Sequence, residues 1–69
     1  MDKNDLTKVE AFLRKTFDNP RIGVRPRPKK DDSAEVYVGE EFAGVLFEDL
    51  EDGEKSFNFQ MAILDIDLE

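Results

Sequence analysis

The apolar side chains of this chain recur at helical spacing in only one segment, and that segment is followed by a proline. Pro20 disfavours helical backbone at the residue before it, so the helix is predicted to span about residues 6–17. One helix can cover only one face of a sheet. If the rest of the chain forms a sheet, its second face must be covered by something else. The residues that carry the helical pattern are Leu6, Val9, Leu13 and Phe17, three or four positions apart.

The rest of the chain alternates apolar and polar residues, which is typical of half-buried strands. Gly39-Glu40 and Asp52-Gly53 have the composition of tight turns between strands. The sequence therefore predicts a single α+β domain over residues 1–69, with one N-terminal helix packed on a three- or four-stranded antiparallel meander sheet. The strands are predicted at about residues 21–25, 34–38, 41–47 and 56–67.

The last predicted strand offers the clearest partner for the helix. Its alternating residues Phe57, Phe59 and Met61 form an apolar stripe. Such a stripe could line a ligand groove, but a core face against the helix is the interpretation we favour. We therefore expect these three side chains to meet the apolar stripe of the helix.

The third predicted strand is apolar on both of its faces. Simple alternation puts Val45 and Phe47 on one side and Phe42 and Leu46 on the other. A monomer of this size would expose an unusually large apolar surface on the side without a helix. We therefore predict self-association through the sheet face opposite the helix. The residues predicted to form that face are Tyr37, Phe42, Leu46, Leu64 and Ile66.

Several classes of reactive site are excluded by composition. The chain has no cysteine and no histidine, which removes disulfides, thiol nucleophiles, histidine bases and zinc sites built from these residues. In the acidic loop 48–54, an EF-hand alignment on Gly53 would put Leu50 at a position that needs an oxygen ligand. The alternating acids Asp65, Asp67 and Glu69 are interpreted as a solvated rim. We expect no catalytic residue, no metal ion, no cofactor and no enzymatic activity.

Charge is distributed unevenly along the chain, whose net charge is −7. Nine of the ten basic residues lie in residues 1–30, and thirteen of the seventeen acids follow them. Because two prolines interrupt residues 26–30, these residues are predicted to form an extended arm after an edge strand. The arm could contact phosphates, but a solvated edge is favoured because nucleic-acid-binding domains are usually basic overall. The candidate partner-binding residues of this basic arm are Arg21, Arg25, Arg27, Lys29 and Lys30.

No continuous apolar run is present in residues 1–20, so neither a signal peptide nor a membrane anchor is predicted. A cytoplasmic location is the expectation that follows, with no membrane partner.

Three strings of residues point to a family. Residues 24–30 (VRPRPKK), 33–38 (SAEVYV) and 58–65 (NFQMAILD) resemble an uncharacterised family of short alphaproteobacterial proteins, classified as a domain of unknown function. The resemblance implies a stand-alone bacterial cytoplasmic protein. It supplies no activity and no catalytic residues.

The function predicted from these features is a non-enzymatic protein–protein interaction module. We expect a homodimer that also presents a charged edge to a protein partner of unknown identity. The alternative is a nucleic-acid-associated protein that uses the basic arm at residues 21–30, although the acidic balance of the chain argues against nucleic acid as a partner.

Overall fold

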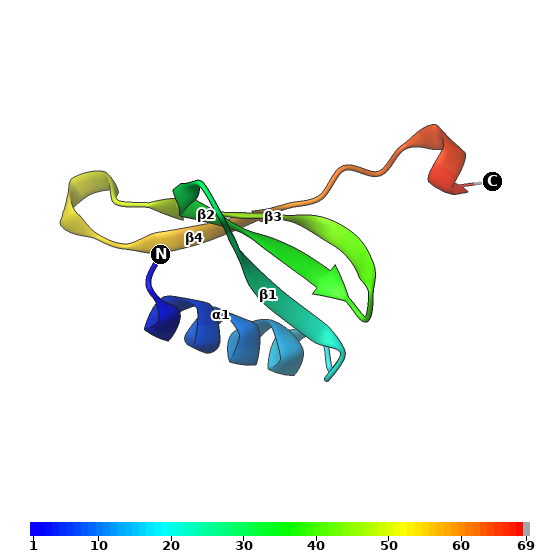
Figure 1. Ribbon diagram of the computed structural model, residues 1–69, viewed down its shortest axis with the longest axis horizontal. Helices are drawn as coiled ribbons and strands as arrows, with labels where there is room; N and C mark the ends of the chain where they lie inside the picture. Colours follow the sequence, from blue (N-terminus) through cyan, green and yellow to red (C-terminus); the bar gives the residue numbers. More distant parts are fainter. Residues whose placement is uncertain (69) are drawn as a thin grey trace.

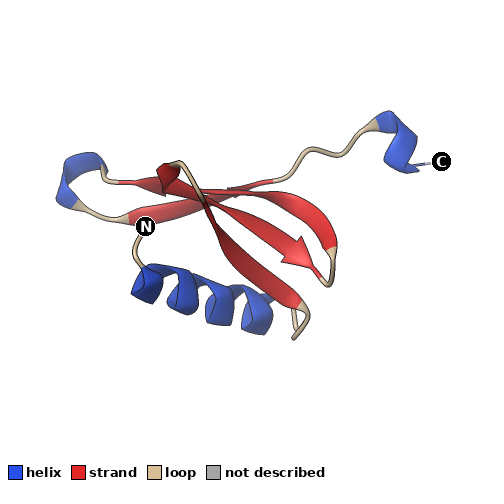
Figure 2. Ribbon diagram, in the orientation of Figure 1, coloured by secondary structure: helices blue, strands red, loops and turns tan. Residues whose placement is uncertain are grey.

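A computed structural model describes residues 1–68 and confirms the predicted α+β architecture (Figure 1). One helix lies against a four-stranded antiparallel sheet whose strands follow each other in chain order (Figure 2). The elements are helix α1 (Lys3–Thr16), strands β1 (Ile22–Arg27), β2 (Lys30–Val38), β3 (Glu41–Asp49) and β4 (Ser56–Gln60), and the 3₁₀ helices η1 (Glu51–Gly53) and η2 (Asp65–Leu68).

Among residues 1–68, no helix is both long enough and apolar enough to cross a membrane.

Helix α1 begins three residues earlier than its apolar pattern predicted, because a capping residue precedes it. The Asp2 carboxylate accepts a hydrogen bond of 2.8 Å from the Asp5 backbone N–H. This bond satisfies one of the amides that the first turn of a helix leaves free. At the other end the N–H of Phe17 donates to the carbonyl of Leu13, and Asp18 takes a left-handed backbone conformation (φ 52°). Aspartate tolerates this conformation better than most residues, so the chain can turn here toward β1.

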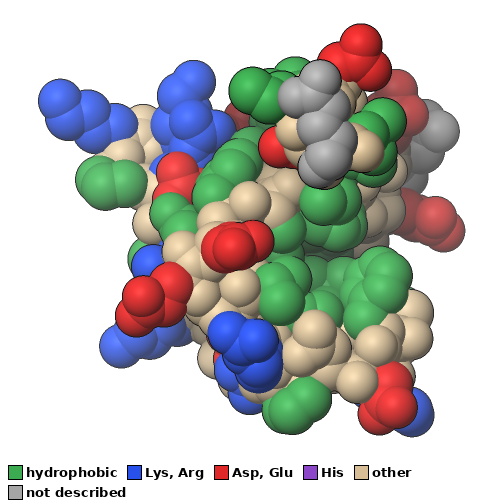
Figure 3. Space-filling model, turned by 90° about the vertical axis from the view of Figure 1, so that its right-hand side faces the viewer, with side chains coloured by type: hydrophobic (Ala, Val, Ile, Leu, Met, Phe, Trp, Pro, Cys, Tyr) green, Lys and Arg blue, Asp and Glu red, His purple; other side chains and the backbone are tan. Residues whose placement is uncertain are grey.

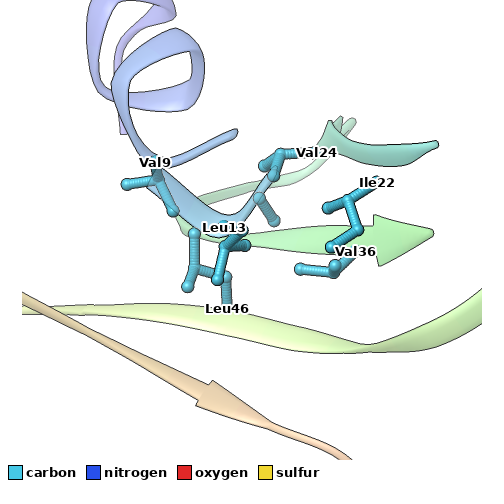
Figure 4. Close-up of a cluster of buried hydrophobic side chains, with 7 residues drawn as sticks. Val9, Leu13, Ile22, Val24, Val36 and Leu46 are labelled. Atoms are coloured by element: carbon cyan, nitrogen blue, oxygen red, sulfur yellow. The ribbon is translucent and has the colours of Figure 1, made fainter. Parts of the chain in front are cut away.

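The core lies between α1 and the nearest strands (Figure 4). The helix contributes Val9 and Leu13, as its apolar pattern predicted. Phe17 was predicted in the same stripe but is exposed, and Met61 was predicted to meet the helix but is also exposed. Both differences arise because α1 packs chiefly on β1 rather than over the centre of the sheet. The sheet contributes Ile22, Val24, Ala34, Val36 and Leu46 to the core.

Polar side chains of α1 hold the helix over the β1 edge. The Glu10 carboxylate accepts a hydrogen bond of 2.9 Å from the Val24 N–H, and Arg14 Nε donates to the Ile22 carbonyl at 2.7 Å. These bonds satisfy backbone groups that an edge strand otherwise offers to another chain. The helix therefore protects the β1 side of the sheet and leaves the inner surface of β4 only partly covered.

A bulge in β3 changes which side chains share a face. Val36 lies opposite Gly44, but the next residue, Tyr37, lies opposite Phe42, so that Ala43 is an extra residue. Such an insertion shifts the alternation of side chains by one position. Leu46 therefore points toward α1 and is only 2% exposed. Its predicted place on the opposite face is wrong, and it is a core residue.

The last predicted strand, residues 56–67, ends at Gln60, which pairs with Val45. The bulge bends β3 at this point, so the residues after Gln60 have no ladder partner on it. Residues 61–64 adopt no regular structure, and η2 follows. We call residues 61–68 the C-terminal segment; it extends beyond the end of the sheet on the side away from α1 (Figure 1). Leu64 and Ile66 therefore do not lie on a strand of the sheet as predicted, although Leu64 lines a hollow together with Phe42.

The predicted extended arm at residues 26–30 is also corrected by the structure. Pro26 and Arg27 belong to β1, and Lys30 opens β2 and pairs with Arg27, so the segment is a hairpin. Pro26 is tolerated within a strand because β1 is an edge strand, as predicted, where one side of the backbone needs no donor.

Candidate functional site

The predicted basic arm does not form one continuous stripe. Arg21 precedes β1, and its guanidinium lies so close to Gly39 that a Cβ there would meet it. Arg25 lies on the sheet face opposite α1, with its guanidinium carbon 4.0 Å from the centre of the Tyr37 ring. Arg27 Nη1 donates to the hydroxyl of Ser33 at 3.3 Å. Each of these arginines therefore has a structural contact within the protein.

The two lysines of the arm, Lys29 and Lys30, lie at the β1–β2 turn, at the far end of β1 from Arg21. Both are exposed. The five predicted residues therefore have different surroundings. The three arginines contact an aromatic ring, a glycine of the β2–β3 turn and a buried hydroxyl, whereas the two lysines are solvated.

Acidic side chains that could suggest chemistry serve local structure instead. Glu48 lies 3.3 Å from the N-terminal amine, and Asp49 accepts a hydrogen bond from the Glu51 N–H. Asp67 accepts a hydrogen bond of 3.0 Å from the Leu64 N–H within the C-terminal segment. Glu69, the third acid of the predicted rim, lies outside the described residues. Among the side chains that the structure describes, which exclude that of Asp52, no three Asp or Glu residues converge as ligands for a metal ion.

The sheet face opposite α1, here called the outer face, carries a strip of apolar side chains. Register places Tyr37 beside Phe42, and their rings meet edge to face with centres 5.7 Å apart. Val45 and Phe47 continue the strip along β3, on the same side as Phe42. Phe42 is 56% exposed and Phe47 is also exposed, whereas Tyr37 and Val45 are half-buried.

The outer face combines projecting side chains with a hollow. A depression of about 220 Å³ opens between Phe42 and Phe47, above Val45. Beside the strip lie charges of both signs: Arg25 stacks on Tyr37, and Glu35 accepts a hydrogen bond of 3.2 Å from the Tyr37 hydroxyl. This face therefore has an apolar centre with a basic and an acidic side chain beside it.

A second apolar surface lies between the helix and the far side of the sheet. Two hollows of about 340 and 380 Å³ share Leu13 and Phe59 and together form what we call the α1–β4 groove. It exists because α1 sits over β1 and leaves the inner side of β4 open. Besides the two shared residues, the lining combines core residues such as Val36 and Leu46 with the more exposed side chains of Lys8, Phe12, Phe17, Phe57 and Met61.

An exposed ion pair links the start of α1 to β4 near this groove. Lys55 Nζ lies 2.7 Å from the Asp5 carboxylate and 6.0 Å from the centre of the Phe57 ring. The hydrogen bond from Lys55 lowers the pKa of Asp5 below 3.8, and the same bond raises the pKa of Lys55 above 10.5. The contribution of Asp5 to stability is therefore present above pH 3.8 and is lost as the pH falls through its lowered pKa.

We expect the Lys55→Gln substitution to return the pKa of Asp5 toward 3.8, because the charged donor is lost. The measurement is an NMR pH titration of the Asp5 carboxyl carbon. Lys15→Gln is the matched control, because it also removes one lysine charge, but at a position ten residues after Asp5. An Asp5 pKa that is equal in the native protein and in Lys55→Gln would contradict the contact.

The C-terminal segment carries the most exposed large apolar side chains in the described part of the chain. Ile66 and Leu68 are 71% and 72% exposed, and Ile63 and Leu64 are also exposed. Figure 3 views the end of the molecule from which this segment projects and shows hydrophobic side chains over much of that surface. Isolated exposed apolar residues are ordinary, whereas a run of them on a projecting segment is unusual.

Sequence reasoning missed the α1–β4 groove and the parts that Val45 and Phe47 play in the outer face. One signal was available. Gly44 interrupts an otherwise apolar strand, and an isolated glycine in a strand indicates a bulge or a close backbone approach. Recognising the bulge would have moved Leu46 into the core and grouped Phe42 with Phe47.

Comparison with known proteins gives a family without an activity. A family model described as a protein of unknown function (DUF3126) matches residues 5–67. No significant match was found among curated proteins or among solved structures. Because the model covers nearly the whole chain, the chain belongs to this family.

Proposed function

We propose that this DUF3126 protein is a non-enzymatic interaction module that associates with a second copy of itself through the outer face of its sheet. The observation that carries the proposal is the apolar strip on that face, with Phe42 and Phe47 projecting on either side of a hollow. An enzymatic role has little support, because the chain has neither histidine nor cysteine, and the side chains of Thr7, Ser33, Asp49 and Asp67 make local structural contacts.

A second copy is the occupant that this face fits best. In a dimer with a two-fold axis the outer face of one copy packs against the outer face of the other. An aromatic side chain of each copy can therefore enter the hollow of its partner. The rim favours the same pairing, because Arg25 and Glu35 offer opposite charges to their counterparts across the axis. Burial of this strip would also add apolar area that a 69-residue chain cannot bury alone.

The net charge of −7 opposes association and predicts its salt dependence. Two copies repel each other at long range, and salt screens charges that lie more than about 8–10 Å apart. The apolar contact itself is short-ranged and is not weakened by salt. We therefore expect the dimer to become tighter as the ionic strength rises.

Phe42→Asp is the variant that tests the proposed interface. Loss of an aromatic ring from the centre of an interface costs about 2 kcal/mol or more, so we expect the dissociation constant to rise at least about 30-fold. The control is Leu50→Asp, which also places a carboxylate at an exposed apolar position but lies outside the outer face. Light scattering across a dilution series gives the dissociation constants of the two variants, and circular dichroism checks that each variant is folded. Equal dissociation constants for the two variants would contradict the interface.

The alternative function, binding of nucleic acid through the basic arm, has less support than self-association. Phosphate contacts need solvated cations on one surface, whereas the structure divides the basic arm among separate contacts. Steep salt-dependent retention of the protein on RNA or DNA would favour that alternative.

A further inference from the structure

The α1–β4 groove and the C-terminal segment are two apolar surfaces that the fold leaves without partners. The groove is floored by Phe59, which the two hollows share, and it continues past Phe57 at one end and Met61 at the other. The C-terminal segment has the complementary form, because it is narrow, apolar and projects from the body (Figure 1). We propose that the C-terminal segment of each copy lies in the α1–β4 groove of the other copy.

Beyond Met61, which lines the groove of its own chain, the segment is directed away from that groove. It leaves the end of β4 on the side opposite α1 (Figure 1), so entry into its own groove would require an immediate reversal. Tight reversals favour Gly, Pro, Asn, Asp or Ser, whereas residues 61–64 are Met-Ala-Ile-Leu. The groove of a second copy can be reached without that reversal.

The length of the segment suits an exchange between copies in which η2 (Asp65–Leu68) opens and the segment becomes extended. Eight extended residues span at most about 26 Å. The two shorter dimensions of one copy are 24 and 23 Å. A segment that starts at the end of β4 can therefore pass across a neighbouring copy and place Ile66 and Leu68 in its groove.

Charge gives the segment a direction in the groove. When the segment is extended, Ile66 and Leu68 lie on one side and Asp65 and Asp67 on the other. Lys8 lines the groove, and Lys55 lies beside Phe57. The apolar side can face Phe59 while the carboxylates face these lysines. Exposed ion pairs contribute little energy, so they select the orientation and the apolar contact supplies most of the affinity.

Cross-linking tests the exchange directly, because the chain contains no cysteine of its own. Phe12→Cys places a thiol in the groove, and Ile66→Cys places one in the C-terminal segment. The two variants are mixed, one of them labelled with ¹⁵N, and are oxidised gently; mass spectrometry then identifies the mixed disulfide. Ala11→Cys is the matched control. Ala11 is the exposed residue directly before Phe12, but it lies with Thr7 and Arg14 on the side of α1 that faces away from the groove.

We expect at least tenfold more mixed disulfide with Phe12→Cys than with Ala11→Cys. Equal yields from a protein that is dimeric would overturn the exchange and leave the proposed function standing. Ring closure within single molecules of a chain that carries both Phe12→Cys and Ile66→Cys would also overturn it. The proposal rests on the proposed self-association, so a native protein that is monomeric throughout would overturn both.

A second pair of variants tests the same contact without cross-linking. Ile66→Asp combined with Leu68→Asp is expected to raise the dissociation constant at least tenfold, because two apolar groups lose their place in the groove. Leu50→Asp again serves as the control for added negative charge at an exposed apolar position. Equal dissociation constants for the two proteins would count against the exchange, and normal circular dichroism excludes misfolding as the cause of a difference.

Discussion

Replacing Leu46 by alanine is expected to lower the free energy of unfolding by about 2–5 kcal/mol, as for other buried leucines. Leu46 is 2% exposed and packs with the core residues that α1 and the first strands contribute (Figure 4). Its neighbours are held by the sheet, so the cavity left by the lost atoms cannot collapse fully. Total stability for a domain of this size is on the order of 5 kcal/mol, so the variant is expected to unfold at far lower urea concentration or not to fold.

Phe42→Ala is the matched control for this prediction. It removes a larger apolar side chain from the same strand, but from the exposed outer face. Measured below the concentration at which copies associate, it is expected to cost less than about 1 kcal/mol, as is usual for exposed positions. The measurement is urea unfolding followed by circular dichroism. A larger cost for Phe42→Ala than for Leu46→Ala would show that the bulge in β3 is misplaced and that Leu46 faces outward.

Gly44→Ala is the second substitution with a large expected effect. A Cβ at this position would clash with the Gln60 carbonyl oxygen and would lie 2.8 Å from the ring of Phe59. The first of these atoms belongs to the backbone of β4 and cannot move without displacing that strand. Overpacking of this kind costs about 1–3 kcal/mol, and a backbone obstacle puts this case at the upper end. Because β4 forms one wall of the α1–β4 groove, the groove should also change shape.

Gly23→Ala is the control for Gly44→Ala. Gly23 also lies in a strand, but an added Cβ would be 3.9 Å from its nearest neighbour, the Glu10 carboxylate, which is ordinary contact. We expect this variant to be neutral or slightly stabilising, because alanine restricts the unfolded chain more than glycine does. Urea unfolding of both variants decides the matter. A fully stable Gly44→Ala protein would show that β4 does not approach β3 so closely.

The elements that sequence predicted well are those set by local pattern. Val9 and Leu13 were predicted in the core because their spacing matches a helix, and both are buried. The meander followed from predicted turns between alternating segments, and the strand order agrees with it, although Asp52-Gly53 belongs to the 3₁₀ helix η1 in a longer loop and not to a tight turn. These features can be predicted from local periodicity, because each depends on residues only a few positions apart.

The elements that sequence predicted poorly depend on contacts between distant segments. One extra residue, Ala43, reverses the assignment of Leu46, and the pairing with β2 decides where that residue falls. Residues 64–67 alternate as a strand does, yet β3 offers no ladder partner to any residue beyond Gln60. The stacking of Arg25 on Tyr37 likewise requires the register between two strands. None of these contacts can be read from local spacing.

The oligomeric state of the native protein is the most direct test of the account, because both proposed contacts bring together two copies of the chain. Sedimentation equilibrium at roughly 100 μM, where a micromolar affinity leaves most chains paired, gives the mass without altering the sequence. The expected result is twice the 8.0 kDa mass of one chain, with tighter association at high salt than at low salt. A mass of 8.0 kDa at both ionic strengths would contradict self-association through the outer face, and with it the exchange of C-terminal segments.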